Sequence, residues 1–198
     1  NYADDAGQRA LVDHVKRQKI NAKVIGIKER PTNYRLQYMV PHNAKASIII
    51  PFKDKVEYLE RLIASILQKS GNVNYEILLL SNNSTEKKTH DYLRKIIQLN
   101  PKIKVYEYNK PFNWSAINNF GRAKASGNFL VFLDNDTEAI SSGWLSELIG
   151  VAAQPQVGAV GPLLLYPDNR IQHAGVILGM KTMAGHVFRF RREGELTE

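Results

Sequence analysis

Two carboxylates separated by one residue follow an apolar run in the second half of the chain. The run Phe129–Leu133 has only large apolar side chains, and Asp134, Asn135 and Asp136 come directly after it. An apolar run of this length is typical of a buried strand. Alternate residues near a strand end point the same way, so Asp134 and Asp136 can converge. Because neighbouring carboxylates repel each other unless a proton or cation intervenes, the pattern predicts an oxygen-ligated divalent ion that bridges to substrate phosphates.

A second interpretation of these carboxylates needs no ligand. Asp134, Asp136 and Glu138 precede a helical pattern that starts at Trp144. Acidic side chains stabilise the N-terminus of a helix, so the cluster could belong to a capping loop. The position of the pair at a strand end favours the metal site over this alternative.

Polar residues also follow the apolar run Glu76–Leu80. The segment Ser81–Thr85 contains Asn82, Asn83 and two hydroxyl side chains besides Ser81. Short side chains of this kind can hydrogen-bond the edge of a nucleobase. They can equally form an Asx-type turn that caps the following helix, and this segment alone favours the turn.

A third polar segment, residues 108–121, contains four asparagines. Asn118 and Gly121 lie one helical turn apart, so they face the same side of the helix that we expect there. Glycine inside a helix is destabilising by about 1 kcal/mol relative to alanine. A close ligand would justify that cost, and so would tight packing of the helix on a sheet.

Apolar runs alternate with helical patterns from Ser47 onward. The runs predicted to be strands are Ser47–Pro51, Glu76–Leu80, Ile103–Tyr106, Phe129–Leu133 and Val157–Leu165. Helices are predicted between them, the first started by a capping box of Asp54 and Glu57 and the third capped by Asn113. This alternation predicts an α/β fold, a Rossmann-like, mostly parallel sheet flanked by helices. Ligands of such sheets bind beyond the carboxyl ends of the strands.

The first 45 residues differ from the rest. A helical pattern over Ala3–Lys19 is followed by short strand patterns at Lys23–Ile27 and Tyr34–Val40. We therefore predict an N-terminal extension over residues 1–45 and one domain over residues 46–198. The chain starts with Asn1 rather than Met, and we expect it to be a piece of a longer protein.

Composition excludes several classes of protein. The 198 residues include no cysteine, which excludes disulfides, thiolate metal sites and a cysteine nucleophile. Apolar residues make up 43% and charged residues 23%, which excludes disorder as the dominant state. No apolar run approaches the roughly 18 residues of a membrane span.

The chain is basic, with 27 Lys and Arg against 19 Asp and Glu and a formal charge of +8. Small basic groups stand at Lys16–Lys19, Lys87–Lys88 and Arg189–Arg192, and the remaining basic residues are scattered. Scattered charge is typical of solvated helix faces. It is also compatible with a surface that meets anionic lipid or phosphorylated substrates.

The motifs together resemble glycosyltransferase family 2. Five segments in the family's order and spacing carry the resemblance, namely residues 47–54, 75–85, 113–121, 125–136 and 157–175. The last of these is similar to members that build bacterial surface polysaccharides. The resemblance extends over about residues 47–190. It implies the glycosyltransferase A type of fold, here ending after the nucleotide-binding half.

The resemblance implies roles for particular residues. The donor nucleotide would lie against Pro51, Phe52, Asp54, Asn82, Asn118, Gly121, Asp134 and Asn135, with Asn82 at the base and Asn135 near the ribose and sugar. Asp136 would hold Mn²⁺ or Mg²⁺ on the donor diphosphate. Ser81 stands where members usually carry Asp, so the nucleotide itself is not implied.

The function implied is sugar transfer from a nucleotide-diphospho-sugar to a saccharide or lipid-linked acceptor, inverting and metal-dependent, in cell-surface polysaccharide synthesis. We expect a cytoplasmic location at the inner face of the membrane and no nucleic-acid partner. Members place an acidic general base well downstream of the DxD pair. Only Glu193, Glu195 and Glu198 stand near the end of this chain, and none is assigned that role. We expect the base to lie outside the chain.

Two alternative functions stay open. A sugar-nucleotide nucleotidyltransferase shares a similar sheet, but it needs a Gly-rich basic loop where this chain has Pro51–Asp54. A basic nucleic-acid-binding module needs basic residues on one face with aromatic residues between them. His173 and His186 are interpreted as structural histidines, although His173 could also approach the donor site.

Overall fold

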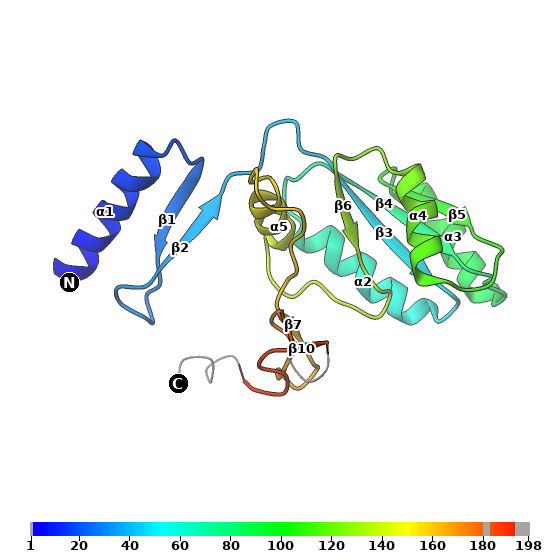
Figure 1. Cartoon of the computed structure of the whole chain (residues 1–198). Coiled ribbons are helices and arrows are strands. Elements are labelled where there is room, and N and C mark those ends of the chain that lie inside the picture. Colours follow the sequence, from blue (N-terminus) through cyan, green and yellow to red (C-terminus); the bar gives the residue numbers. More distant parts are fainter. Residues whose placement is uncertain (1, 180–182, 193–198) are drawn as a thin grey trace. The chain divides into compact units, whose positions relative to one another are not determined.

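A four-stranded parallel sheet lies at the centre of the fold. Its strands are β3 (Ala46–Phe52), β4 (Tyr75–Ser81), β5 (Ile103–Glu107) and β6 (Phe129–Phe132), in the spatial order β5-β4-β3-β6 (Figure 1). Every neighbouring pair in this sheet is parallel. The prediction of a mostly parallel sheet with these four strands is confirmed. The computed structural model describes residues 2–179 and 183–192.

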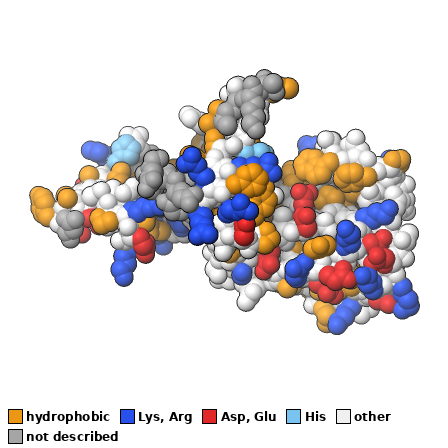
Figure 2. Space-filling model, turned by 90° about the horizontal axis from the view of Figure 1, so that it is seen from below, with side chains coloured by type: hydrophobic (Ala, Val, Ile, Leu, Met, Phe, Trp, Pro, Cys, Tyr) orange, Lys and Arg blue, Asp and Glu red, His pale blue; other side chains and the backbone are white. Residues whose placement is uncertain are grey.

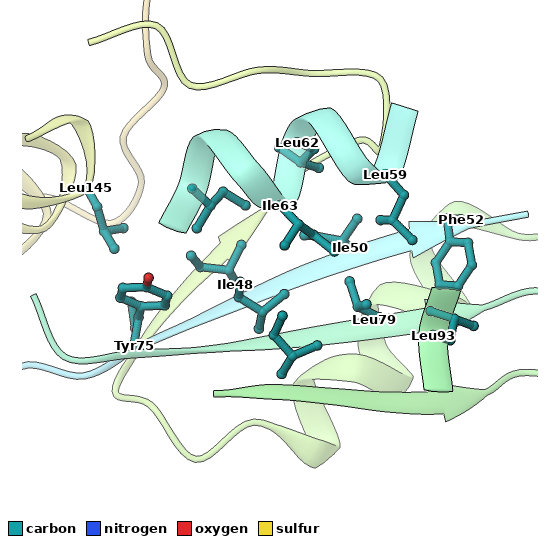
Figure 3. Packing of buried hydrophobic residues seen from close by; sticks show 14 of the residues in the cluster. Ile48, Ile50, Phe52, Leu59, Leu62, Ile63, Tyr75, Leu79, Leu93 and Leu145 are labelled. Carbon is teal, nitrogen blue, oxygen red and sulfur yellow. The ribbon is translucent and has the colours of Figure 1, made fainter. Parts of the chain in front are cut away.

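Helices cover both faces of this sheet. On one face α2 (Val56–Lys69), α3 (Lys87–Leu99) and α5 (Trp144–Ala152) share a buried cluster with the strands. On the other face α4 (Trp114–Lys124) covers Ile49, Leu78 and Leu80. Figure 3 shows Leu59, Leu62 and Ile63 of α2 pointing toward Ile48 and Ile50 of β3. None of the helices in the described ranges is long and apolar enough to cross a membrane.

Burial on both faces explains the unbroken apolar runs. All seven residues of β4 are buried, as are all of β3 except Pro51. A parallel strand covered on both sides has no solvent face, so its sequence does not alternate between apolar and polar residues. Each large aliphatic side chain removed from water contributes about 1.5–3 kcal/mol. β3 and β4 therefore form the most strongly stabilised part of the sheet.

The predicted capping box at the start of α2 is wrong. The helix begins after Lys55, which has the left-handed φ of 50°, and no side chain caps it. Asp54 also has a φ of 50°, and its carboxylate accepts the backbone N–H groups of Thr85 and Glu86 instead. The left-handed backbone thus turns Asp54 away from α2 and toward the loop after β4.

The structure divides the chain into two compact units, residues 1–153 and residues 154–198. The second unit contains the short strands β7 (Leu164–Leu165), β8 (Ile171–His173), β9 (Val176–Leu178) and β10 (Ala184–His186). They form two antiparallel pairs, β7 with β8 and β9 with β10.

The predicted strand Val157–Leu165 is wrong except for its last two residues. Gly158, Gly161 and Pro162 interrupt that segment. Glycine weakens a strand, and proline cannot donate to the ladder, so the apolar residues between them do not pair.

The N-terminal segment folds against α5. Its elements are α1 (Tyr2–Arg17) and the antiparallel hairpin of β1 (Ala22–Gly26) and β2 (Tyr34–Tyr38), as predicted within a few residues. The Tyr34 hydroxyl donates to the Asp4 carbonyl at 2.7 Å, and Gln37 Nε2 donates to Glu147 of α5 at 2.6 Å. The segment belongs to the same compact unit as the sheet, and the division at residue 45 stays a prediction.

A buried carboxylate stabilises the amino end of the sheet. Glu76 on β4 is 3% exposed and accepts hydrogen bonds from Ser47 at 2.7 Å, from Ser126 N–H at 2.7 Å and from Lys104 Nζ at 2.8 Å. Burial alone would raise the pKa of Glu76. The bonds from Lys104, Ser126 and Ser47 outweigh it and lower the pKa to about 2. Glu76 thus joins β3, β4, β5 and the segment before β6.

We expect Glu76→Gln to lower the free energy of unfolding by about 3 kcal/mol at neutral pH, because each pKa unit corresponds to about 1.4 kcal/mol. The folded-state pKa lies below the ordinary value of 4.5. The contribution is therefore complete above about pH 4.5 and is lost as the pH falls toward about 2. Urea unfolding at pH 7 and pH 3 measures it. The exposed Glu107→Gln is the control, and equal stability of both variants at pH 7 would contradict the assignment.

Candidate functional site

A hollow of about 150 Å³ lies beyond the carboxyl ends of the parallel strands. Four separate segments line it, and their residues are Pro51, Phe52, Lys53, Asn82, Phe112, Trp114, Asp134 and Asn135. The segments lie at or after the carboxyl ends of β3, β4, β5 and β6. They meet because parallel strands present their carboxyl ends at one edge of a sheet. Five residues predicted from the sequence are therefore brought together here, namely Pro51, Phe52, Asn82, Asp134 and Asn135.

Asn82 is held in one orientation at the end of β4. It is 4% exposed, and its Nδ2 donates to the carbonyls of Tyr108 and Lys110, both at 2.9 Å. Two carbonyl partners can be satisfied only by the NH₂ end of the amide, so Oδ1 is the atom left to meet a ligand. Asn82 does not cap α3, whose N-cap position is Glu86. The turn interpretation therefore does not account for this residue.

Asp54 contacts the loop after β4 and does not line the hollow. Its Oδ1 accepts from the N–H groups of Thr85 and Glu86, both at 2.9 Å, and its own N–H donates to Ser84 Oγ at 3.1 Å. Burial raises the pKa of Asp54, but the N–H groups of Glu86 and Thr85 outweigh it and keep the pKa below its ordinary value. Asp54 thus fixes the loop that presents Asn82, and its direct contact with a donor stays a prediction.

A turn, and not strand alternation, orients the acidic pair after β6. The strand ends at Phe132, and the Asp134 carbonyl accepts from Thr137 N–H at 3.3 Å and Thr137 Oγ1 at 2.8 Å. Asp134 lines the hollow, whereas Asp136 does not. Asp136 is exposed, and within residues 2–179 and 183–192 no hydrogen bond or ion pair engages its carboxylate.

The acidic pair offers ligand atoms of the kind that hard divalent ions prefer. Both carboxylates are exposed, and carboxylate oxygen suits Mg²⁺ and Mn²⁺. No group of three or more His, Asp or Glu side chains suited to a metal occurs in the described part of the chain. One or two carboxylates are sufficient when substrate phosphates and water complete the coordination. The helix-cap alternative is not supported, because α5 has Gly143 at its N-cap and no side-chain cap.

The family of the chain follows from a comparison with known families. A model of glycosyl transferase family 2 matches residues 47–192, which include the sheet and every residue lining the hollow. The chain belongs to glycosyl transferase family 2.

Two similar proteins are much longer than this chain. O-antigen biosynthesis protein RfbC of Myxococcus xanthus is 42% identical over 195 residues, which is 98% of this chain and 15% of that protein. The uncharacterized protein y4gI of Sinorhizobium fredii is 36% identical over 185 residues, 93% of this chain and 20% of that protein. The chain thus spans a fifth or less of the length of these two relatives.

Two solved structures share the fold. A mannosyltransferase, PcManGT from Pyrobaculum calidifontis in complex with GDP-Man and Mn²⁺, has a TM-score of 0.57 at 17% identity and matches 84% of this chain and 46% of that one. GalNAc-T7 with UDP, GalNAc and Mn²⁺ has a TM-score of 0.51 at 21% identity and matches 58% and 22%. The predicted glycosyltransferase A type of fold is confirmed.

Sequence reasoning missed three residues of this family 2 site, namely Lys53, Phe112 and Trp114. Phe112 is 67% exposed and Trp114 is 51% exposed, and the Trp114 ring lies 6.4 Å from that of Phe132. Two large aromatic side chains in an asparagine-rich segment were the available signal. Exposed aromatic residues that gather at a hollow mark a binding site more often than single ones elsewhere.

Asn118 and Gly121 of α4 do not line the hollow. A Cβ added to Gly121 would lie 2.6 Å from Ile49 Cγ2 and 2.7 Å from Leu80 Cδ1, so tight helix–sheet packing accounts for this glycine. Asn118 Nδ2 donates to the Trp114 carbonyl at 2.9 Å, and its buried Oδ1 has no partner within the described residues. Their contact with a donor stays a prediction.

A larger hollow of about 320 Å³ lies in the second unit and contains none of the predicted site residues. Its rings, Tyr166 and Phe190, already stack on each other at 5.5 Å, and Arg170 pairs with Asp168 at 2.7 Å. The rings and the charged side chains of this hollow are therefore already engaged with one another. Glu193, Glu195 and Glu198, which the sequence left without a role, lie outside the described residues.

Charges of both signs are mixed over part of one face of the molecule. On the face drawn in Figure 2, basic and acidic side chains are interspersed over the right-hand part of the view. A nucleic-acid-binding surface needs a continuous basic patch or groove.

We expect Gly121→Ala to destabilise the fold by about 1–2 kcal/mol. Two contacts below 3 Å put the cost of overpacking at about 2–3 kcal/mol, and the helix preference of alanine over glycine offsets about 1 kcal/mol of that. Urea unfolding measures the change. The control is Gly26→Ala, because a Cβ at Gly26 would meet nothing within 4 Å. If Gly121→Ala were as stable as the wild type, packing would not explain the glycine.

Proposed function

We propose that this chain forms the donor-binding part of a glycosyltransferase that moves a sugar from a nucleotide-diphospho-sugar to a saccharide or lipid-linked acceptor, with inversion. The observation that carries the proposal is the hollow in which Asn82, Asp134 and Asn135 meet at the carboxyl edge of the sheet. Family 2 membership supports it. The relative named for O-antigen biosynthesis supports a role in surface-polysaccharide synthesis.

Asn82 would read the base of the donor. Because its Nδ2 is engaged by two backbone carbonyls, Oδ1 can only accept a hydrogen bond from the ligand. At the central ring nitrogen of the base-pairing edge, uracil and guanine carry an N–H, whereas cytosine and adenine carry a lone pair and can donate only from their exocyclic amino group. Oδ1 would lie opposite this central position. The locked amide therefore favours uridine or guanosine donors. The two structural neighbours are complexes with UDP and with GDP-Man, which supports this assignment.

Asp134 and Asp136 would hold the ion on the diphosphate of the donor. When bound, Mn²⁺ or Mg²⁺ supplies positive charge that stabilises the leaving nucleoside diphosphate. Lys53, an exposed ammonium at the rim of the hollow, adds charge of the same sign toward the phosphates. A hollow of about 150 Å³ is smaller than the roughly 300 Å³ or more of most ligand pockets, so it would hold only part of the donor.

Two features weigh against the alternative functions. The end of β3 and the start of the loop after it, residues Pro51–Asp54, contain none of the glycines with which a nucleotidyltransferase would surround phosphate. The interspersed surface charges do not favour nucleic acid. The general base, the acceptor, the cytoplasmic location and the association with a membrane surface stay predictions from the sequence.

We expect the wild-type chain to bind UDP and GDP at least about tenfold more tightly than CDP and ADP in the presence of Mn²⁺. The reason is that a lone pair facing Oδ1 leaves a buried acceptor unsatisfied, which costs about 1–3 kcal/mol. Isothermal titration calorimetry with the four diphosphates measures it. Asn82→Ala should abolish the preference. Asn83→Ala, whose amide also donates to the Lys110 carbonyl but does not line the hollow, should keep it. Equal affinity of the wild type for all four would refute the base assignment.

We expect Asp136→Asn to remove the strengthening of UDP or GDP binding by Mn²⁺. The side chain is exposed, so the midpoint of thermal unfolding should stay near that of the wild type. Titrations with and without Mn²⁺ measure the effect. The matched control is the exposed Glu138→Gln, two residues further on. An unchanged dependence on Mn²⁺ in Asp136→Asn would show that this carboxylate is not a ligand.

A further inference from the structure

Two histidines of the second unit meet side by side. His173 ends β8 and His186 ends β10, and their Nδ1 atoms lie 3.0 Å apart. The ring centroids are 5.1 Å apart with the planes at 80°. The ring edges that carry Nδ1 therefore face each other, although the residues are thirteen positions apart in the chain.

Backbone geometry holds this pair together. Gly175, which follows β8 after one residue, has a φ of 124°, a conformation that side-chain-bearing residues rarely adopt. Its carbonyl accepts from the N–H of Val187, directly after His186, at 3.2 Å. The bond pins the end of β10 beside the end of β8. The backbone thus brings the two residues within reach of each other, and the side-chain rotamers bring the Nδ1 atoms to 3.0 Å.

The short distance restricts the chemistry of the rings. Two facing nitrogens at hydrogen-bond distance need one proton between them, so one Nδ1 donates and the other accepts. At least one ring then has an unprotonated nitrogen directed at its partner. An unprotonated imidazole nitrogen is the form that binds a metal.

We propose that His173 and His186 form a binding site for a borderline transition-metal ion of the Zn²⁺, Ni²⁺ or Cu²⁺ class. Nitrogen ligands lie about 2.0–2.1 Å from such ions. Two nitrogens on one ion are therefore about 2.9 Å apart at a right angle and about 3.4 Å apart in a tetrahedron. The observed 3.0 Å lies between these values, so the separation of the nitrogens needs little change, and each ring turns to direct its Nδ1 lone pair at the ion. The ion takes the place of the shared proton, which moves to Nε2 of the same ring.

The surroundings leave room for the ion. His186 is exposed and His173 is half-buried. Residue 161, whose Cβ would lie 3.4 Å from His173 Nε2, is a glycine, so no side chain crowds the Nε2 edge, to which the displaced proton can move. No third His, Asp or Glu joins the pair among residues 2–179 and 183–192. Water or a ligand oxygen would complete the coordination, which implies weaker binding than in a closed four-ligand site.

The ligand chemistry separates this site from the acidic pair after β6. Imidazole nitrogen favours Zn²⁺, Ni²⁺ and Cu²⁺, whereas carboxylate oxygen favours Mg²⁺ and Mn²⁺. The inference does not rest on the proposed function, because it involves neither nucleotide nor sugar.

Calorimetric titration of the tag-free chain with Ni²⁺ tests the proposal. We expect saturable binding of one ion per chain, at least tenfold weaker in His173→Ala and in His186→Ala. His42→Ala, which removes an exposed histidine of the first unit, should bind like the wild type. Mn²⁺ in place of Ni²⁺ should not bind at the histidine pair.

A spectroscopic measurement on the wild-type chain separates the loss of a metal ligand from the misfolding of a variant. Electron paramagnetic resonance of the wild-type chain with one equivalent of Cu²⁺ should show hyperfine coupling to two imidazole nitrogens, and the conservative His186→Gln should show one. Absence of saturable Ni²⁺ binding to the wild type would overturn the proposal. So would an affinity in His173→Ala equal to that of the wild type, or an equal loss in His42→Ala.

Discussion

The double-sided burial of β3 and β4 is the constraint on which the rest of the first unit depends. Because α2, α3 and α5 cover one face and α4 the other, both strands lie in an apolar interior with their polar termini at the sheet edges. At the amino edge one buried carboxylate, Glu76, accepts hydrogen bonds from three neighbouring segments. At the carboxyl edge, residues of the loops that follow the strands line the hollow.

Backbone groups carry most of the organisation at that carboxyl edge. Asp54 receives two N–H groups from the loop after β4, and Asn82 donates to two carbonyls of the loop after β5. Each buried polar side chain therefore satisfies the backbone of a different loop. Asp54 and Asn82 thus stabilise the loops around the hollow through their hydrogen bonds. Asp136 has no such role, because it is exposed and makes no hydrogen bond within the described residues.

The two units place different ligand chemistry at different points of one chain. The sheet unit has exposed carboxylates at a turn beside the hollow, which suit a hard ion shared with phosphate. The second unit has two facing imidazoles at the ends of short strands, which suit a borderline ion. Each site follows from its own backbone, a turn in the first unit and the hydrogen bond from Val187 N–H to the Gly175 carbonyl in the second.

The sequence by itself determined the four parallel strands, the helices between them and the edge at which the site lies, because apolar runs and helical periodicity report burial directly. It also identified five of the eight residues that line the hollow. Tertiary structure alone decided what depends on backbone angles and on distant partners. The left-handed turn at Asp54 sends its carboxylate to the loop after β4, and Ile49 and Leu80 explain Gly121. His173 meets His186 only because the antiparallel pairing of β9 and β10 sets His186 beside Val176, and no local pattern encodes such a contact.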